Sequence, residues 1–160
     1  MCKLFGSKIL SLDAYIQYAR KQAGYIPRTE VLLSDVKAEL EALGLKCMLT
    51  SDPDIRVFYT DEFTLTRIFP FLTFSAEYYV ASLDVDCDDY SKWAAGFASL
   101  IFSVNGVFQV WGDSPGGPHA WSMAKVGISL YKHWEPNAGF KFAGELFNAD
   151  EHMYIPKKWK

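Results

Sequence analysis

Residues 90–134 constrain the fold more than any other part of this 160-residue chain. The proline-free run from Tyr90 to Phe102 is typical of an amphipathic helix. After the turn signal Asn105-Gly106, alternating apolar residues predict a strand over 107–111. Two further strands, His119–Val126 and Ile128–Trp134, are predicted to pair tightly about the glycine between them. A helix followed by at least three antiparallel strands predicts an α+β fold.

The first half is expected to be mainly helical. Ser11 is a suitable cap for a helix that ends near Gly24, and a second helix is predicted from about Thr29 or Ser34 to Leu43. A short strand is predicted over Ile55–Tyr59. With no repeat and no linker, the pattern predicts one domain over 1–160, with a helical N-terminal part at about 1–50 and a catalytic-like core at about 75–145.

Composition excludes several classes of protein. A hydrophobic content of 50% is typical of a globular chain, and a net charge of -3 argues against a general nucleic-acid binder. No apolar run is long enough to cross a membrane, and the first residues lack the pattern of a signal peptide, so we expect no membrane partner and a location compatible with the cytoplasm. Three cysteines, with no CxxC pair, are typical of a reducing compartment.

Three residues form a candidate catalytic set. Cys87 lies at the predicted start of a helix, where the free N–H groups and the helix dipole favour a thiolate and can hold an oxyanion. His119 follows a Gly/Pro-rich segment, 112–118, which composition predicts to be a loop, and it is expected at a sheet edge facing the helix. Glu135 lies as far from Gly127 as His119 does, so a hairpin about Gly127 sets the two almost directly opposite. A carboxylate there can fix the imidazole tautomer of a nucleophile–base pair.

Each of these residues also has an ordinary structural interpretation. A single cysteine is more often a buried apolar side chain, and a single histidine is more often a satisfied core or surface group. Their joint placement is what favours catalysis.

Three short motifs resemble a known family. Asp86-Cys87-Asp88-Asp89-Tyr90, Gly117-Pro118-His119-Ala120-Trp121 and Trp134-Glu135-Pro136-Asn137-Ala138-Gly139 resemble the cysteine-protease domain appended to a mushroom agglutinin and its bacterial and phage relatives. More distantly they look like transglutaminase-like cysteine peptidases. The resemblance covers about 78–139 and implies a papain/transglutaminase-like fold, with Cys87 as nucleophile, His119 as base and Glu135 as third member.

The sequence departs from that pattern in two places. Papain-like enzymes usually place a glutamine a few residues before the nucleophile, whereas this chain has Tyr78 and Tyr79 there. We expect either a tyrosine or the backbone alone to complete the oxyanion hole. Ser122 stands where the resemblance leads us to expect asparagine.

Four carboxylates surround the cysteine, and they oppose its ionisation. They are Asp84, Asp86, Asp88 and Asp89. A Ca²⁺ ion would use such hard oxygen ligands and cancel their charge, and the resemblance implies calcium dependence. The alternative is that these residues are solvated helix caps.

The sequence therefore predicts a cysteine hydrolase acting on amide bonds of a peptide or protein. Transglutaminase-type acyl transfer would use the same three residues, and cell-wall amidases use a similar cysteine and histidine. A further alternative is a catalytically silent papain-like fold that serves as a structural or interaction protein, such as a virion component. Asp113, Ser114, His133 and Trp134 are predicted near the cleft, while His152 and the tail 157–160 are predicted to be solvated.

Overall fold

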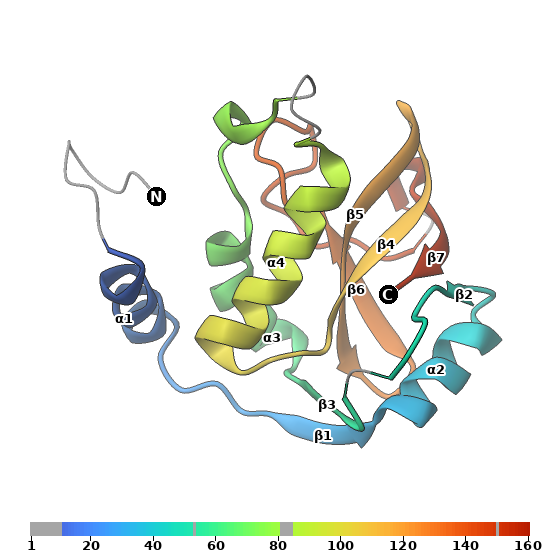
Figure 1. The fold of residues 1–160 in the computed structure, drawn as a ribbon, viewed down its shortest axis with the longest axis horizontal. Coiled ribbons are helices and arrows are strands. Elements are labelled where there is room, and N and C mark those ends of the chain that lie inside the picture. Colours follow the sequence, from blue (N-terminus) through green and yellow to red (C-terminus); the bar gives the residue numbers. More distant parts are fainter. Residues whose placement is uncertain (1–10, 53, 81–84, 150) are drawn as a thin grey trace.

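A computed structural model describes residues 11–52, 54–80, 85–149 and 151–160 (Figure 1). The helical elements are α1 (Leu12–Ala23), α2 (Leu33–Ala42), α3 (Glu62–Ile68) and α4 (Cys87–Phe102), with short 3-10 turns at Phe69–Leu72, Ala76–Tyr78 and Glu151–Met153. The strands are β1 (Thr29–Leu32), β2 (Lys46–Cys47), β3 (Arg56–Tyr59), β4 (Val107–Ser114), β5 (Gly117–Gly127), β6 (Leu130–Trp134) and β7 (Ile155–Trp159).

The main sheet has the strand order β2-β7-β4-β5-β6. Strands β4, β5 and β6 form an antiparallel meander, β7 pairs antiparallel with β4, and β2 pairs parallel with β7. Strands β1 and β3 form a separate two-stranded antiparallel sheet. This arrangement confirms the predicted α+β class.

The first half contains strands as well as the predicted helices. The cap at Ser11 and the stop at Gly24 are both as predicted for α1, since the Ser11 side chain accepts from the Ala14 N–H and Gly24 has a positive φ. The second helix begins only at Leu33, because the residues before it pair with β3 as strand β1. Leu43, the predicted end of this helix, directly follows the last helical residue and is exposed.

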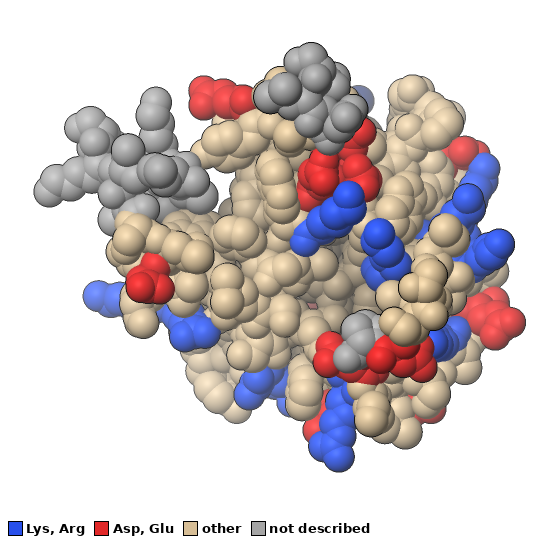
Figure 2. Space-filling view, viewed as in Figure 1, with Lys and Arg blue, Asp and Glu red and all other residues tan. Residues whose placement is uncertain are grey.

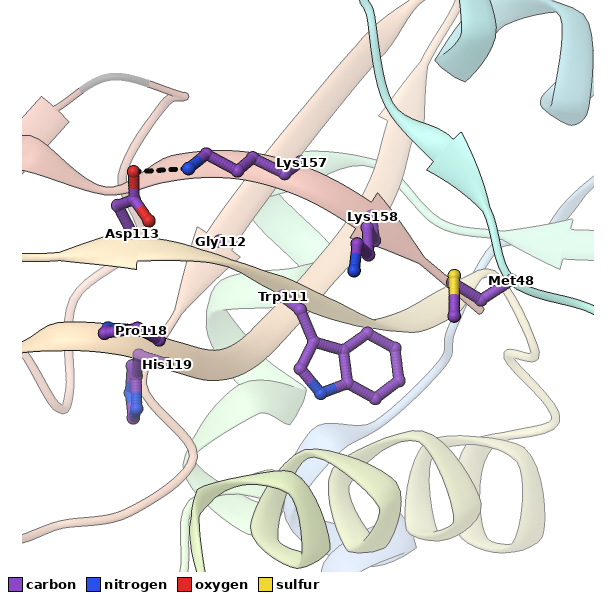
Figure 3. A pocket seen from close by; sticks show the side chains of 8 residues that line it. All are labelled: Met48, Trp111, Gly112, Asp113, Pro118, His119, Lys157 and Lys158. Atoms are coloured by element: carbon purple, nitrogen blue, oxygen red, sulfur yellow. Dashed lines mark hydrogen bonds and ion pairs between the residues drawn. The ribbon is translucent and has the colours of Figure 1, made fainter.

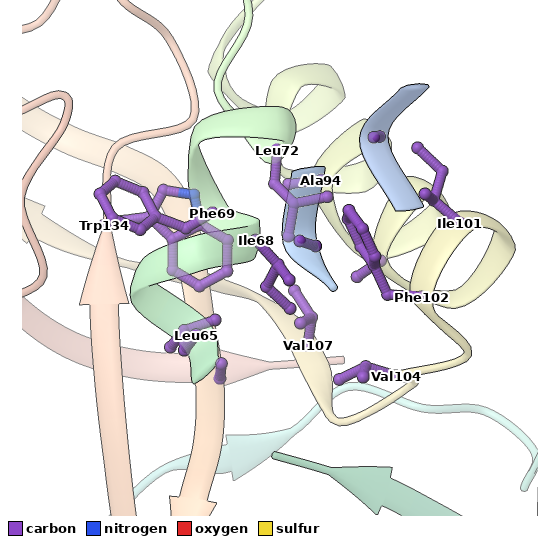
Figure 4. Close-up of a cluster of buried hydrophobic side chains, with 14 of the residues drawn as sticks. Leu65, Ile68, Phe69, Leu72, Ala94, Ile101, Phe102, Val104, Val107 and Trp134 are labelled. Carbon is purple, nitrogen blue, oxygen red and sulfur yellow. The ribbon is translucent and has the colours of Figure 1, made fainter. Parts of the chain in front are cut away.

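Two hydrophobic clusters lie on opposite sides of the main sheet. The first joins α1, α3 and α4 to the sheet through residues such as Leu65, Ala94 and Val107 (Figure 4). The second packs α2 against the other face, with Trp121 and Trp159 at its centre. Because both faces are covered, β5 is buried over most of its length and β4 is buried over its first half, Val107–Val110.

The predicted loop over 112–118 is wrong. Strand β4 continues to Ser114 and β5 starts at Gly117, so only two residues connect them. Composition misleads here because Gly112 has a packing role within the strand. A Cβ on Gly112 would lie 2.0 Å from the carbonyl oxygen of Ile155, so only glycine lets β7 approach this closely.

The predicted solvated tail is also wrong. Residues 155–159 form strand β7 between β2 and β4, and Trp159 is completely buried. The lysines that suggested a solvated tail are exposed, while the strand pairs through its backbone and buries its tryptophan. Among the helices described, none is long and apolar enough for a membrane span.

Candidate active site

Cys87 is the first residue of α4, as predicted. Asp86 caps the helix, accepting the Asp88 N–H at 3.0 Å, and the Asp89 carboxylate accepts the Asp86 N–H at 3.3 Å. This reciprocal capping box specifies where the helix begins, and a cap of this kind typically stabilises a helix by about 1 kcal/mol. The thiol is half-buried and forms no disulfide. It therefore sits at the positive end of the dipole of a 16-residue helix.

His119 and Glu135 are hydrogen-bonded to each other in the interior. The His119 Nε2 and the Glu135 Oε1 are 2.8 Å apart, and both side chains are buried. The imidazole stacks on the ring of Phe140, with centroids 4.6 Å apart. Because one ring nitrogen is held by the carboxylate and one ring face is covered by Phe140, the orientation of the imidazole is fixed.

The pairing register of β5 and β6, which brings His119 and Glu135 together, differs from the predicted register. Strands β5 and β6 pair Met123 with His133 and Gly127 with Leu130, with an irregularity between Lys125 and Gly127. The hairpin is therefore not symmetric about Gly127, and Glu135 lies beyond the end of β6, diagonal to His119. A diagonal neighbour is still within reach of long side chains. His119 was expected at a sheet edge, but β5 is an interior strand.

The charge of His119 is set by three competing effects. Burial alone lowers the pKa of the imidazole, but hydrogen bonds to Cys87 and Glu135, with the charges of both, outweigh burial and raise the pKa to about 9. The ring is thus an imidazolium at neutral pH. It lies in contact with the Cys87 sulfur on one side and the Glu135 carboxylate on the other.

A tyrosine also contacts the carboxylate. Burial, and after it the neighbouring Glu135 carboxylate, raises the pKa of Tyr154 above its usual range. Tyr154 immediately precedes β7, and its ring meets that of His119 edge-on at 6.2 Å. Sequence reasoning missed Tyr154 because the tail was predicted to be solvated.

Gln109 links the sheet to the helix start. Its Nε2 donates to the carbonyl of Asp88 at 2.7 Å, so β4 holds the first turn of α4 in place. The side chain is buried, and a polar residue in the apolar run Val107–Val110 was the available signal. Of the two tyrosines considered for the oxyanion hole, Tyr79 is exposed.

Lys92 compensates part of the charge of the acidic cluster. Carboxylate oxygens of Asp86, Asp88 and Asp89 all lie within 4.8 Å of one another, and Asp84 lies outside the described residues. Lys92 forms ion pairs with Asp88 and Asp89, the latter at 3.2 Å. The three carboxylates have the oxygen chemistry of a Ca²⁺ site, but caps and Lys92 already engage them, so they fit a bound ion poorly. Ca²⁺ binding at this cluster stays a prediction.

The remaining predicted site residues are placed differently. His133 is buried away from solvent, where it accepts the Trp121 Nε1–H at 2.9 Å, and burial lowers its pKa to about 4. Trp134 belongs to the first hydrophobic cluster. Asp113 lines a hollow beside His119 (Figure 3). Ser114 is the last residue of β4, and its hydroxyl donates to the Gly117 carbonyl at 3.0 Å across the hairpin. His152 is exposed and pairs with Glu145.

Comparison with known proteins yields a structural match. A solved structure described as "PSL1a-E64 complex" superposes with a TM-score of 0.54 and 19% sequence identity, over 81% of this chain and 50% of that chain. The chain thus spans about half the length of this structural neighbour. No protein-family model and no curated protein matches the sequence. At this identity the likeness concerns the fold alone, and it confirms the predicted papain-like α+β fold.

Proposed function

We propose that this protein is a cysteine hydrolase, a peptidase or amidase, in which Cys87 is the nucleophile, His119 the acid–base and Glu135 the orienting carboxylate. The observation that carries the proposal is a helix-start thiol in contact with an imidazolium that a buried carboxylate holds at 2.8 Å. A buried His–Glu pair alone can be structural. The thiol at the other side of the ring is what makes the group suited to acyl transfer.

The proposed reaction uses the His119 imidazolium as its proton donor. The Cys87 thiolate attacks the carbonyl carbon of a substrate amide, and the C–N bond breaks as the amine takes the proton of the His119 imidazolium. Neutral His119 then removes a proton from water, whose oxygen attacks the thioester. The carboxylic acid product leaves, the thiolate is restored, and His119 carries the proton again. Glu135 stabilises the imidazolium at both ends of the cycle.

The backbone supplies the oxyanion site in this proposal. The Asp88 N–H already donates to the Asp86 carboxylate, so it is not free to bind an oxyanion. The N–H of Cys87 itself, at the positive end of α4, is the donor we assign to the developing oxyanion. This assignment replaces the glutamine that the papain-like pattern would place before the nucleophile.

Two lines of support come from outside the geometry. E64 is an inhibitor of cysteine proteases, and the structural neighbour is described as its complex. The motifs around Cys87, His119 and Glu135 resemble those of the agglutinin-type protease domain in the same order. Both support the proposed roles.

The test is covalent labelling by E64 followed by mass spectrometry. We expect one inhibitor per chain, attached to the peptide that contains Cys87, together with loss of hydrolysis of a protein substrate such as casein. Cys87→Ala should abolish both labelling and hydrolysis, while Cys47→Ala, the matched control, should leave both intact. Unlabelled Cys87 in a folded chain without hydrolytic activity would overturn the proposal in favour of a silent fold. Incorporation of an amine into casein in place of hydrolysis would identify a transferase.

A further inference from the structure

A row of basic side chains crosses one end of the sheet. Lys46 of β2 lies directly opposite Lys158 of β7, and Lys158 lies directly opposite Trp111 of β4. Residues opposite each other in neighbouring strands project from the same face. The Lys160 Nζ lies 5.1 Å from the centre of the Trp111 ring, so it joins the same row. We call Lys46, Lys158, Lys160 and Trp111 the basic row.

The positive charge of this row is not compensated. Neighbouring Lys157 is paired with Asp113 at 2.6 Å. None of the three lysines of the basic row has a carboxylate partner within the part of the chain that the structure describes. Figure 2 shows lysine and arginine side chains at the right of the view, over β2 and β7, with acidic side chains beside some of them. Like charges placed opposite each other in a sheet are destabilising, so an anionic ligand would relieve a cost that the fold carries.

The basic row borders the proposed active site. Lys158 and Trp111 line a hollow of about 340 Å³ whose wall also includes Pro118 and His119 (Figure 3). Trp111 lies two residues beyond Gln109, whose amide holds the first turn of α4. A substrate whose cleaved bond lies at Cys87 and His119 can therefore place a neighbouring group in the hollow. The volume lies within the range of known ligand pockets.

We propose that this hollow is a substrate subsite for a carboxylate group, which Lys158 pairs with while Trp111 packs against the adjoining carbons. The inference rests on the proposed hydrolase function, because it names the substrate class of that site. The carboxylate can come from an acidic side chain or from the C-terminus of a peptide. Both sources offer the same chemistry to the ammonium groups.

Peptide pairs that differ only by Glu or Gln test the subsite. The peptides are acetylated and amidated, with the variable residue placed at each position around the cleaved bond in turn. At low ionic strength we expect kcat/KM to be about fivefold higher for Glu at one of these positions, the upper range for an exposed ion pair. Lys158→Gln should remove the preference, and Lys158→Glu should transfer it to a Lys peptide. The matched control is Lys21→Gln, an exposed lysine of α1.

A second set of peptides separates the two sources of the carboxylate. A preference that appears only when the peptide has a free C-terminus would assign the subsite to a terminal carboxylate. Equal kcat/KM for Glu and Gln peptides and for free and amidated ends would overturn the subsite even though hydrolysis is real.

Binding without turnover separates this inference from the proposed function. The anisotropy of fluorescein-labelled Glu and Gln peptides is measured on the Cys87→Ala chain, where no cleavage is expected. Tighter binding of the Glu peptide, lost in Cys87→Ala/Lys158→Gln and weakened by salt, supports the subsite even if the unsubstituted chain cleaves nothing. Equal affinities that salt does not change would overturn it.

Discussion

The charge on His119 depends on two neighbours, and each can be removed separately. Its pKa of about 9 is the outcome of burial, which favours the neutral ring, against Cys87 and Glu135, which favour the imidazolium. The ordinary value for histidine is about 6.5. The proton that the proposed mechanism delivers to the leaving amine is therefore held in place by the nucleophile itself.

Cys87→Ala should lower the pKa of His119. Removing the thiol removes both its hydrogen bond and its charge, while burial stays. We expect the titration midpoint of the His119 ring, followed by NMR, to move from near 9 toward or below the ordinary value. Glu135→Gln should move it in the same direction. The ring signals of the exposed His152, recorded at one fixed pH, are the internal reference and should be the same in both variants. A His119 midpoint that is unaltered by Cys87→Ala would contradict the contact between these two side chains.

The direction in which hydrolysis changes with pH follows from the His119 pKa of about 9. The imidazolium is present below about pH 9 and is lost as pH rises through about 9. We therefore expect kcat/KM to fall above pH 9, because the leaving amine then lacks its proton donor. Alkylation of Cys87 by iodoacetamide needs only the thiolate, so its rate should not fall over the same range. Parallel loss of both would point to unfolding instead.

At the scale of elements, the approach of β7 to β4 positions the residues around the site. A β-bulge lies between Trp111 and Gly112, where β4 pairs with β7. Bulges of this kind redirect side chains and are frequent beside active sites. Here Trp111 and Gly112, on the two sides of the bulge, both line the hollow, and Gly112 also packs against the backbone of Ile155.

Gly112→Ala should destabilise the protein by about 1–3 kcal/mol, the usual cost of overpacking. The new Cβ would lie 2.0 Å from the Ile155 oxygen and 2.9 Å from the Trp121 ring, so the backbone of β7 has to shift. Urea unfolding measures the loss. Gly116→Ala is the matched control in the same hairpin, where the nearest atom is 3.8 Å away and we expect little change. Equal stabilities of the two variants would mean that β7 does not pack closely on Gly112.

At the scale of the whole molecule, the end of the chain completes the sheet. Strand β7 joins β2, from the first third of the sequence, to β4, which follows α4. It also contributes Trp159 to the cluster that anchors α2, and Tyr154, just before it, contacts Glu135. The last residues therefore support both the fold and the orientation of the carboxylate.

Trp159→Ala should cost about 3–5 kcal/mol of unfolding free energy, as expected for a large buried aromatic residue. The loss arises because Trp159 is fully buried against Phe108, with ring centroids 5.1 Å apart. Ile155→Ala, in the same strand but about half exposed, is the control and should cost much less. If the two substitutions cost the same, β7 contributes to stability only through its backbone pairing.

The sequence by itself determined the elements that local chemistry specifies. The cap at Ser11, the stop at Gly24 and the start of α4 at Cys87 follow from side chains within a few residues of each helix end. The α+β class follows from a helical run and alternating strands. The proximity of His119 and Glu135 was also predicted, although the register used for it was wrong, because the irregularity after Lys125 shifts the pairing.

Only the tertiary structure decided which residues become neighbours across long distances in the chain. The strand at 155–159 was hidden because its lysines are exposed, and what makes it a strand is its pairing with β2 and β4. Gly112 signalled a loop in the sequence, yet it is required by the contact with Ile155, 43 residues away (155 − 112). The basic row likewise exists only because parallel and antiparallel pairing bring Lys46, Trp111 and Lys158 into one line. Backbone pairing between distant strands leaves no local pattern, so the sequence alone could not reveal it.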